Sequence, residues 1–215
     1  MRKILYAVLL ALIPSVAFSQ VVMMRTTLGE DGWERVFYGV NKEFARQKFD
    51  KNWRLRKTKG RIPDGVAKEY NEQGTLIREY RYRNANRDGL SRVYHENGRL
   101  ASEKNYRKGK LEGASKTYYE NGNLKLKRNY KNGKLNGVCK KYGCNGKLLF
   151  EYNYKKGKQQ GITREYRENG ILKSEHNFKN NKLHGASSFY DENGQIICIE
   201  TYKNGKKIGR QNISD

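Results

Sequence analysis

The sequence predicts an all-β protein, an elongated single antiparallel β-meander of six 24-residue hairpin repeats with a small N-terminal cap. Three observations predict this fold: glycines recur every 24 residues, a second glycine column follows nine residues later, and apolar residues alternate with polar ones between them. A fixed period of this length is typical of repeat proteins, in which one small unit stacks on its neighbours. The first column is Gly65, Gly89, Gly113, Gly137, Gly161, Gly185 and Gly209. The second is Gly74, Gly98, Gly122, Gly146, Gly170 and Gly194.

The chain begins with the features of a secretory signal peptide. Residues 1–3 are Met-Arg-Lys, an apolar run covers 4–13, and the small residues Ala17 and Ser19 follow. A membrane anchor is the alternative, but a bilayer-spanning helix needs about 20 apolar residues. We therefore expect residues 1–19 to be removed and the mature protein to be exported, periplasmic or extracellular, either free or associated with the envelope.

Residues 20–64 lack the repeat and are expected to form an N-terminal cap. They carry both tryptophans, and an open meander needs cover at its edge because unpaired strands promote aggregation. Within this segment, Asn41 through Lys51 is predicted to be a short helix with Asn41 as its N-cap. The repeats occupy residues 65–209, and residues 210–215 form a stub that is expected to blunt the far edge.

Each repeat is predicted to be a β-hairpin with two glycine-bearing turns. In residues 89–113 the turns are Asn97-Gly98 and Lys108-Gly109. Asn-Gly between strand-forming segments is a strong hairpin signal because both residues tolerate positive φ. Apolar and tyrosine positions fall at even offsets, which predicts one apolar and aromatic face per strand. The opposite face, expected to be wet, carries Ser91, Ser115, Thr163 and Ser187.

The repeat resembles the variant MORN repeat of many bacterial proteins. Its pattern is Gly-x4-Tyr-Tyr-Glu-Asn-Gly-x-Leu-x-x-Glu-x-x-Tyr-x-x-Gly-x-Leu-x-Gly, which residues 118–122 and 130–137 follow almost position for position. The resemblance covers residues 65–209 and implies an elongated sheet that binds proteins, with acidic phospholipid binding credited to some members. Such proteins are commonly labelled YwqK-type antitoxins, which implies a toxin as partner. A signal peptide is unusual for an antitoxin that acts inside its own cell.

The sequence lacks the arrangements that catalysis or metal binding requires. The three histidines occupy different repeat offsets, and no HExxH, paired CxxC or Ser-Gly elbow is present. We therefore expect a protein without enzymatic activity, cofactor or metal. Cysteines are few: Cys139 and Cys144 either form a disulfide across a hairpin tip or are small substitutions at repeat positions.

The chain is strongly basic, with a formal net charge of +23 that becomes +21 once Arg2 and Lys3 are removed. This charge favours anionic partners. Export argues against nucleic acid, which leaves anionic lipid headgroups, acidic glycans or an acidic protein. The alternative is that the charge only keeps the sheet soluble and monomeric.

Two sets of residues are candidates for binding. In the first, a basic column shares its face with tyrosines two residues further on, which suits anionic or ring-bearing ligands through charge and cation–π contact. It comprises Lys68, Arg92, Lys116, Lys140, Arg164, Tyr94, Tyr118, Tyr142 and Tyr166. The second set lies at turns along one edge and suits an anionic membrane surface. It comprises Lys108, Lys134, Lys158, Lys182 and Lys206.

The basic column also has a structural interpretation, in which the aliphatic stems cover the tyrosine rings and the charges reach water. A column of glutamates is expected to pair with neighbouring cations in a solvated charge ladder. Its members are Glu79, Glu103, Glu151 and Glu175. The leading hypothesis is an exported, non-enzymatic module that binds another protein along its sheet. The alternatives are a YwqK-type antitoxin or immunity protein that binds a toxin, and peripheral binding to anionic lipid or lipopolysaccharide.

Overall fold

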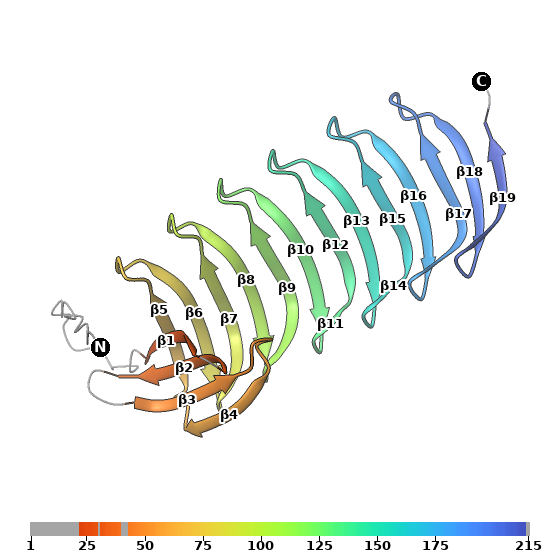
Figure 1. Cartoon of the computed structure of the whole chain (residues 1–215). Helices are drawn as coiled ribbons and strands as arrows, with labels where there is room; N and C mark the ends of the chain where they lie inside the picture. The colour runs from red at the N-terminus through yellow and green to blue at the C-terminus, as the bar shows by residue number, and fades with distance from the viewer. Residues whose placement is uncertain (1–21, 30, 40–42, 214–215) are drawn as a thin grey trace.

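The computed structural model describes residues 22–29, 31–39 and 43–213, which form nineteen β-strands in one long, open sheet (Figure 1). The expected signal peptide, residues 1–19, lies outside the described residues. In the described part of the chain, no helix is long and apolar enough to cross a membrane.

The first four strands precede the repeats: β1 (Val22–Gly29), β2 (Gly32–Tyr38), β3 (Glu43–Phe49) and β4 (Leu55–Gly60). They pair antiparallel in sequence order, and β1 joins the repeats through a short parallel pairing of Val22 and Met23 with Ala67 and Lys68. Figure 1 shows these strands crossing the first repeats at the N-terminal end of the sheet. We call β1–β4 the cap.

The predicted helix over residues 41–51 is wrong. Residues 43–49 form strand β3, which pairs with β2 on one side and β4 on the other. Ala45 lies opposite Phe37, and both are fully buried. The two ladders satisfy the backbone groups of β3, so tertiary pairing overrides the local helical pattern. Residues 40–42 lie outside the described residues.

The repeats form an antiparallel meander in which each long strand pairs with the next. Two short strands, β11 and β14, begin the return strands of their hairpins. The repeat strands are β5 (Gly65–Tyr70), β6 (Leu76–Arg83), β7 (Asn86–Tyr94), β8 (Leu100–Arg107), β9 (Lys110–Tyr118), β10 (Leu124–Lys131), β11 (Lys134–Leu135), β12 (Gly137–Tyr142), β13 (Leu148–Lys155), β14 (Lys158–Gln159), β15 (Gly161–Tyr166), β16 (Leu172–Lys179), β17 (Lys182–Tyr190), β18 (Ile196–Lys203) and β19 (Lys206–Asn212). The all-β meander of six repeats is therefore confirmed.

The two turns of each repeat differ in backbone conformation. At the second turn both central residues have positive φ, as in Asn132 (52°) and Gly133 (78°), which is the mirror-image turn that matches strand twist. At the first turn only the glycine does: Gly122 has a φ of 92°, and its N–H donates to the Tyr119 carbonyl. The asparagine before it, Asn121, accepts the Asn123 N–H at 3.0 Å instead. The expectation of two positive φ values at this turn is wrong.

A β-bulge in each hairpin exchanges the two faces of the sheet. Arg92 lies opposite Glu103, but Tyr94 lies opposite Leu100, so one residue of β8 is left over. Side chains before and after this residue therefore fall on opposite faces despite their even spacing. Tyr94 shares the face of Arg92, whereas Tyr106 lies opposite Gly89 and shares the other. The prediction of one apolar and aromatic face per strand is therefore wrong for β8, where Leu100 and Tyr106 lie on opposite faces.

The small polar residues expected to be wet are buried. Their column includes Ser91 at 4% and Ser187 at 1% relative exposure. Each has a large side chain directly opposite on a neighbouring strand, such as Lys104 beside Ser91 and His176 beside Ser187. The large neighbouring side chains cover the small residue between them. Its burial therefore does not require a second layer of secondary structure. We call this side the groove face and the side that carries Arg92 and Glu103 the ladder face.

The hydrophobic core lies between the cap and the groove face of the first repeat. Phe37 of the cap contacts Tyr82 edge to face, with ring centroids 5.3 Å apart. Arg35 lies over the Tyr80 ring at 5.5 Å. The core consists of Val22, Met24, Phe37, Ala45, Ile62, Ala67, Tyr80 and Tyr82.

Candidate binding surfaces

The groove face is hollowed in the middle of the sheet. A hollow of about 370 Å³ lies over β10, β12 and β13, lined mainly by groove-face side chains. Its lining includes Leu126, Arg128, Tyr130, Cys139, Tyr152 and Tyr154. An open apolar and aromatic hollow with a few polar groups is the usual form of a ligand site.

Aromatic rings and cations alternate along this part of the groove face. Tyr152 stacks on Phe150 at a centroid distance of 5.7 Å, and the Lys141 ammonium lies over the Phe150 ring at 5.3 Å. Arg128 is exposed beside the hollow. Such a surface attracts apolar segments and carboxylates together. These residues were not predicted as a site, because even spacing was expected to place the apolar and aromatic side chains of each strand on one face.

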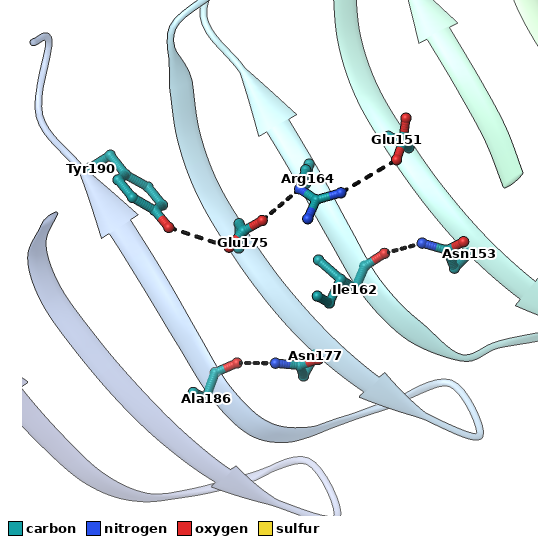
Figure 2. A network of polar contacts seen from close by, with 8 residues as sticks. All are labelled: Glu151, Asn153, Ile162, Arg164, Glu175, Asn177, Ala186 and Tyr190. Carbon is teal, nitrogen blue, oxygen red and sulfur yellow. Dashed lines mark hydrogen bonds and ion pairs between the residues drawn. The ribbon is translucent and has the colours of Figure 1, made fainter. Parts of the chain in front are cut away.

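The ladder face carries the predicted basic column, and its charges are paired. Arg164 bridges two glutamates: its Nη1 lies 3.5 Å from Glu151 and its Nε 2.5 Å from Glu175 (Figure 2). Tyr190 extends this chain by donating its hydroxyl to Glu175 at 3.3 Å. The hydrogen bond to Glu175 raises the pKa of Arg164. The predicted charge ladder is therefore present.

The other members of the column follow the same pattern. Arg92 contacts Glu79 at 3.2 Å, and Lys68 lies at 4.0 Å from the same carboxylate. The hydrogen bond to Glu151 likewise raises the pKa of Lys140. The cations face glutamates, rather than only reaching water above the tyrosine rings. The tyrosines of this face are half-buried: Tyr94, Tyr118, Tyr142 and Tyr166.

An asparagine column on the ladder face was missed in the sequence analysis. Asn153 and Asn177 donate their amides to the carbonyls of Ile162 and Ala186, at 2.6 and 3.0 Å (Figure 2). Each carbonyl directly follows a first-column glycine of positive φ. The asparagines recur every 24 residues, so the period itself carried a signal that could have identified them.

Exposed cations line the hairpin ends at the second turns, and we call them the tip row. Cross-strand partners are both cationic in the last five hairpins, as in Lys155 opposite Lys158. The row comprises Arg107, Lys108, Lys110, Lys131, Lys134, Lys155, Lys156, Lys158, Lys179, Lys182, Lys203 and Lys206. Lys134, Lys158, Lys182 and Lys206 begin their strands, whereas Lys108 lies inside a turn with a φ of 49°. It does not belong to the same repeat column as the other four.

The side chains that accept hydrogen bonds from the second turns change from carboxylates to other groups toward the C-terminus. At each second turn, the backbone N–H that opens the turn donates a hydrogen bond to a side chain. In the first repeats the acceptor is a carboxylate: Asp88 accepts from Lys108 at 3.2 Å and Glu112 from Asn132 at 2.8 Å. In the later repeats a neutral side chain replaces it, such as Asn136 at 3.3 Å from Lys156. The positive charge at the tips is therefore least compensated in the last three repeats.

The cysteines are not paired with one another. All three cysteines are free: Cys139 and Cys198 are buried, and Cys144 lies exposed in a turn. The disulfide considered from the sequence is thus absent. Among the described residues, no group of three His, Cys, Asp or Glu side chains is placed to hold a metal.

Comparison with known families identifies the repeat. The family model described as MORN repeat variant matches six segments, which together cover more than half of the chain: residues 63–84, 87–108, 111–132, 135–156, 159–180 and 183–204. Each segment begins two residues before a glycine of the first column. The comparison with curated proteins gave no match.

Proposed function

Because the chain belongs to the MORN repeat variant family, we propose that it is a non-enzymatic binding module that holds another protein along its groove face. The open aromatic hollow over β10, β12 and β13 carries this proposal. Its apolar rings supply contact area, and Arg128 and Lys141 favour a segment that bears carboxylates.

The cap supports this proposal because it already occupies the same face. Its apolar strands pack against Ala67, Tyr80 and Tyr82 of the first repeat. A groove face that takes an extended apolar ribbon at one end is suited to a similar segment further along. In Figure 1 the repeats from β12 onward extend beyond the cap. We propose that the partner presents such a segment to these repeats.

We further propose that the module acts outside the cytoplasm, as a periplasmic or extracellular monomer. The leader-like composition of residues 1–19 supports export. The resemblance to YwqK-type antitoxins supports one particular partner, a toxin encountered in the same compartment.

Affinity capture tests the proposal. The tagged mature protein is incubated with its own envelope fraction at low and high salt, and bound proteins and lipids are identified. We expect a stoichiometric protein that survives high salt. The double variant Tyr130→Ala/Tyr154→Ala should lose it, while Tyr142→Ala on the ladder face should retain it. Retention by the groove variant, with its fold intact by circular dichroism, would exclude the groove face as the binding surface.

The tip row favours a second candidate, peripheral attachment to anionic lipid or lipopolysaccharide. Its cations are exposed on one edge, and those of the last three repeats lack capping carboxylates. Lysines near an anionic surface contribute about 1 kcal/mol each and lose this on salt addition. Vesicles containing phosphatidylglycerol should therefore bind the protein at low salt and release it at high salt. Lys155→Glu/Lys158→Glu should weaken binding, and salt-independent binding would contradict this candidate.

A further inference from the structure

The charge ladder carries a lysine in place of a glutamate at strand β10. The glutamate column continues through Glu103 and Glu151, but Lys127 stands between them at the same repeat position. It lies directly opposite Lys116 of β9 and directly opposite Lys140 of β12. Three lysines thus occupy consecutive strands, at positions where the first, second, fourth and fifth repeats pair a cation with a glutamate.

The two outer lysines, Lys116 and Lys140, each pair with a glutamate on the side away from β10. Lys116 Nζ lies 3.3 Å from Glu103, and Lys140 Nζ lies 2.9 Å from Glu151. Both carboxylates lie on the strands away from β10. Within the part of the chain that the structure describes, no carboxylate lies within 4.0 Å of the Lys127 ammonium. The excess positive charge is therefore centred on Lys127, which is exposed.

The surroundings add positive charge. Strand β10 also carries Lys125 and Lys131 and contains no carboxylate. Like charges directly opposite one another on a sheet are destabilising. An anion bound among these three lysines would offset their mutual repulsion.

We propose that Lys116, Lys127 and Lys140 bind one phosphate or sulfate group, either free or as part of a larger molecule. Neighbouring strands are about 4.8 Å apart, so the three Cα atoms span roughly 10 Å, and lysine stems are long enough to converge above them. A tetrahedral oxyanion offers a separate oxygen to each ammonium, whereas a carboxylate has only two. The site lies on the ladder face, so it is independent of a partner on the groove face and of lipid at the tips.

Comparison with the other repeats indicates the substitution that tests this site. Lys127→Glu restores the residue found at this position in four other repeats. The full chain is titrated with sodium pyrophosphate and with sodium sulfate at constant ionic strength, by calorimetry and by thermal unfolding. The unmodified protein should bind at least one of these ions and unfold at a higher temperature in its presence. Lys127→Glu should lose about tenfold or more in affinity and unfold at a higher temperature without anion.

The control variant is Lys147→Glu, which makes the same charge change at another exposed lysine. It should keep the affinity of the unmodified protein within about twofold, because a distant exposed charge is largely screened. Lys127→Gln, which adds no negative charge, should lose binding as well. Absence of binding to both ions, or an equal loss in Lys127→Glu and Lys147→Glu, would overturn the site.

Discussion

Asn153 donates its side-chain amide to the carbonyl of Ile162 at 2.6 Å, and Asn177 makes the same contact with Ala186 one repeat later (Figure 2). The contact satisfies a carbonyl that directly follows a first-column glycine of positive φ. We expect Asn153→Ala to lower the free energy of unfolding by about 1 kcal/mol, because the carbonyl loses its partner. Urea denaturation followed by circular dichroism measures this change.

The matched control is Thr201→Ala, the last position of the same repeat column, where the side chain is exposed. It should change the free energy of unfolding by less than about 0.5 kcal/mol. An equal effect of both substitutions would mean that the asparagine amide contributes no stability.

Two glycines of the first column differ in backbone conformation, and comparing them tests the contribution of backbone strain. Gly185 has a φ of 92°, whereas Gly209 lies outside the positive region. A Cβ at either position meets only ordinary contacts, at 3.7 Å from Asn177 and 3.8 Å from Thr201. Gly185→Ala should therefore cost about 1–2 kcal/mol through its conformation alone. Gly209→Ala should be neutral or slightly stabilising, because alanine reduces the freedom of the unfolded chain.

Thermal and urea denaturation of the two variants provide the comparison. If Gly209→Ala destabilised as much as Gly185→Ala, contacts rather than positive φ would explain the glycine period.

The period and the turn residues were sufficient to predict the meander, since they recur in every repeat and need no tertiary information. The side-chain faces were not predictable in the same way. A single extra residue in β8 places Tyr106 on the other face of the sheet from Tyr94. No residue type marks this bulge in the sequence. The same inversion explains why Ser91 is buried rather than wet. Strand β3 was missed because its pairing with β2 and β4, rather than its local pattern, decides its structure.

The candidate binding surfaces were likewise predictable from the sequence only in part. The pairing of Arg164 with Glu151 and Glu175 was predictable because opposite charges share one register in four of the six repeats. The hollow beside Tyr152 was not, because it depends on which face each aromatic row occupies. Lys127 was visible in the sequence as a break in the glutamate column, but only the register shows that it lies between Lys116 and Lys140.

His176 should make the stability depend on pH. It packs against Phe189 on the groove face, and burial lowers its pKa below the ordinary value of 6.5. The unfolded chain therefore binds a proton at a higher pH than the folded chain does. Well above pH 6.5, the contribution of His176 to the free energy of unfolding should be constant. The free energy of unfolding should then fall as the pH drops through this value.

Urea titrations between about pH 5.5 and 8, above the range in which most carboxylates titrate, measure this dependence. His176→Gln should flatten it. A variant that kept the full slope would show that another group is responsible.

The cysteines should differ sharply in reactivity. Cys144 is exposed in a turn, whereas Cys139 and Cys198 are buried. Burial raises the pKa of the Cys139 thiol, which lowers its thiolate fraction as well as its access to reagent. In the folded protein one thiol should react rapidly with Ellman's reagent, and the other two should react at least about tenfold more slowly until urea is added. Cys144→Ser should remove the rapid phase and leave the slow one. A protein with no rapid thiol and only one reactive thiol in urea would instead contain a disulfide between Cys144 and a buried cysteine.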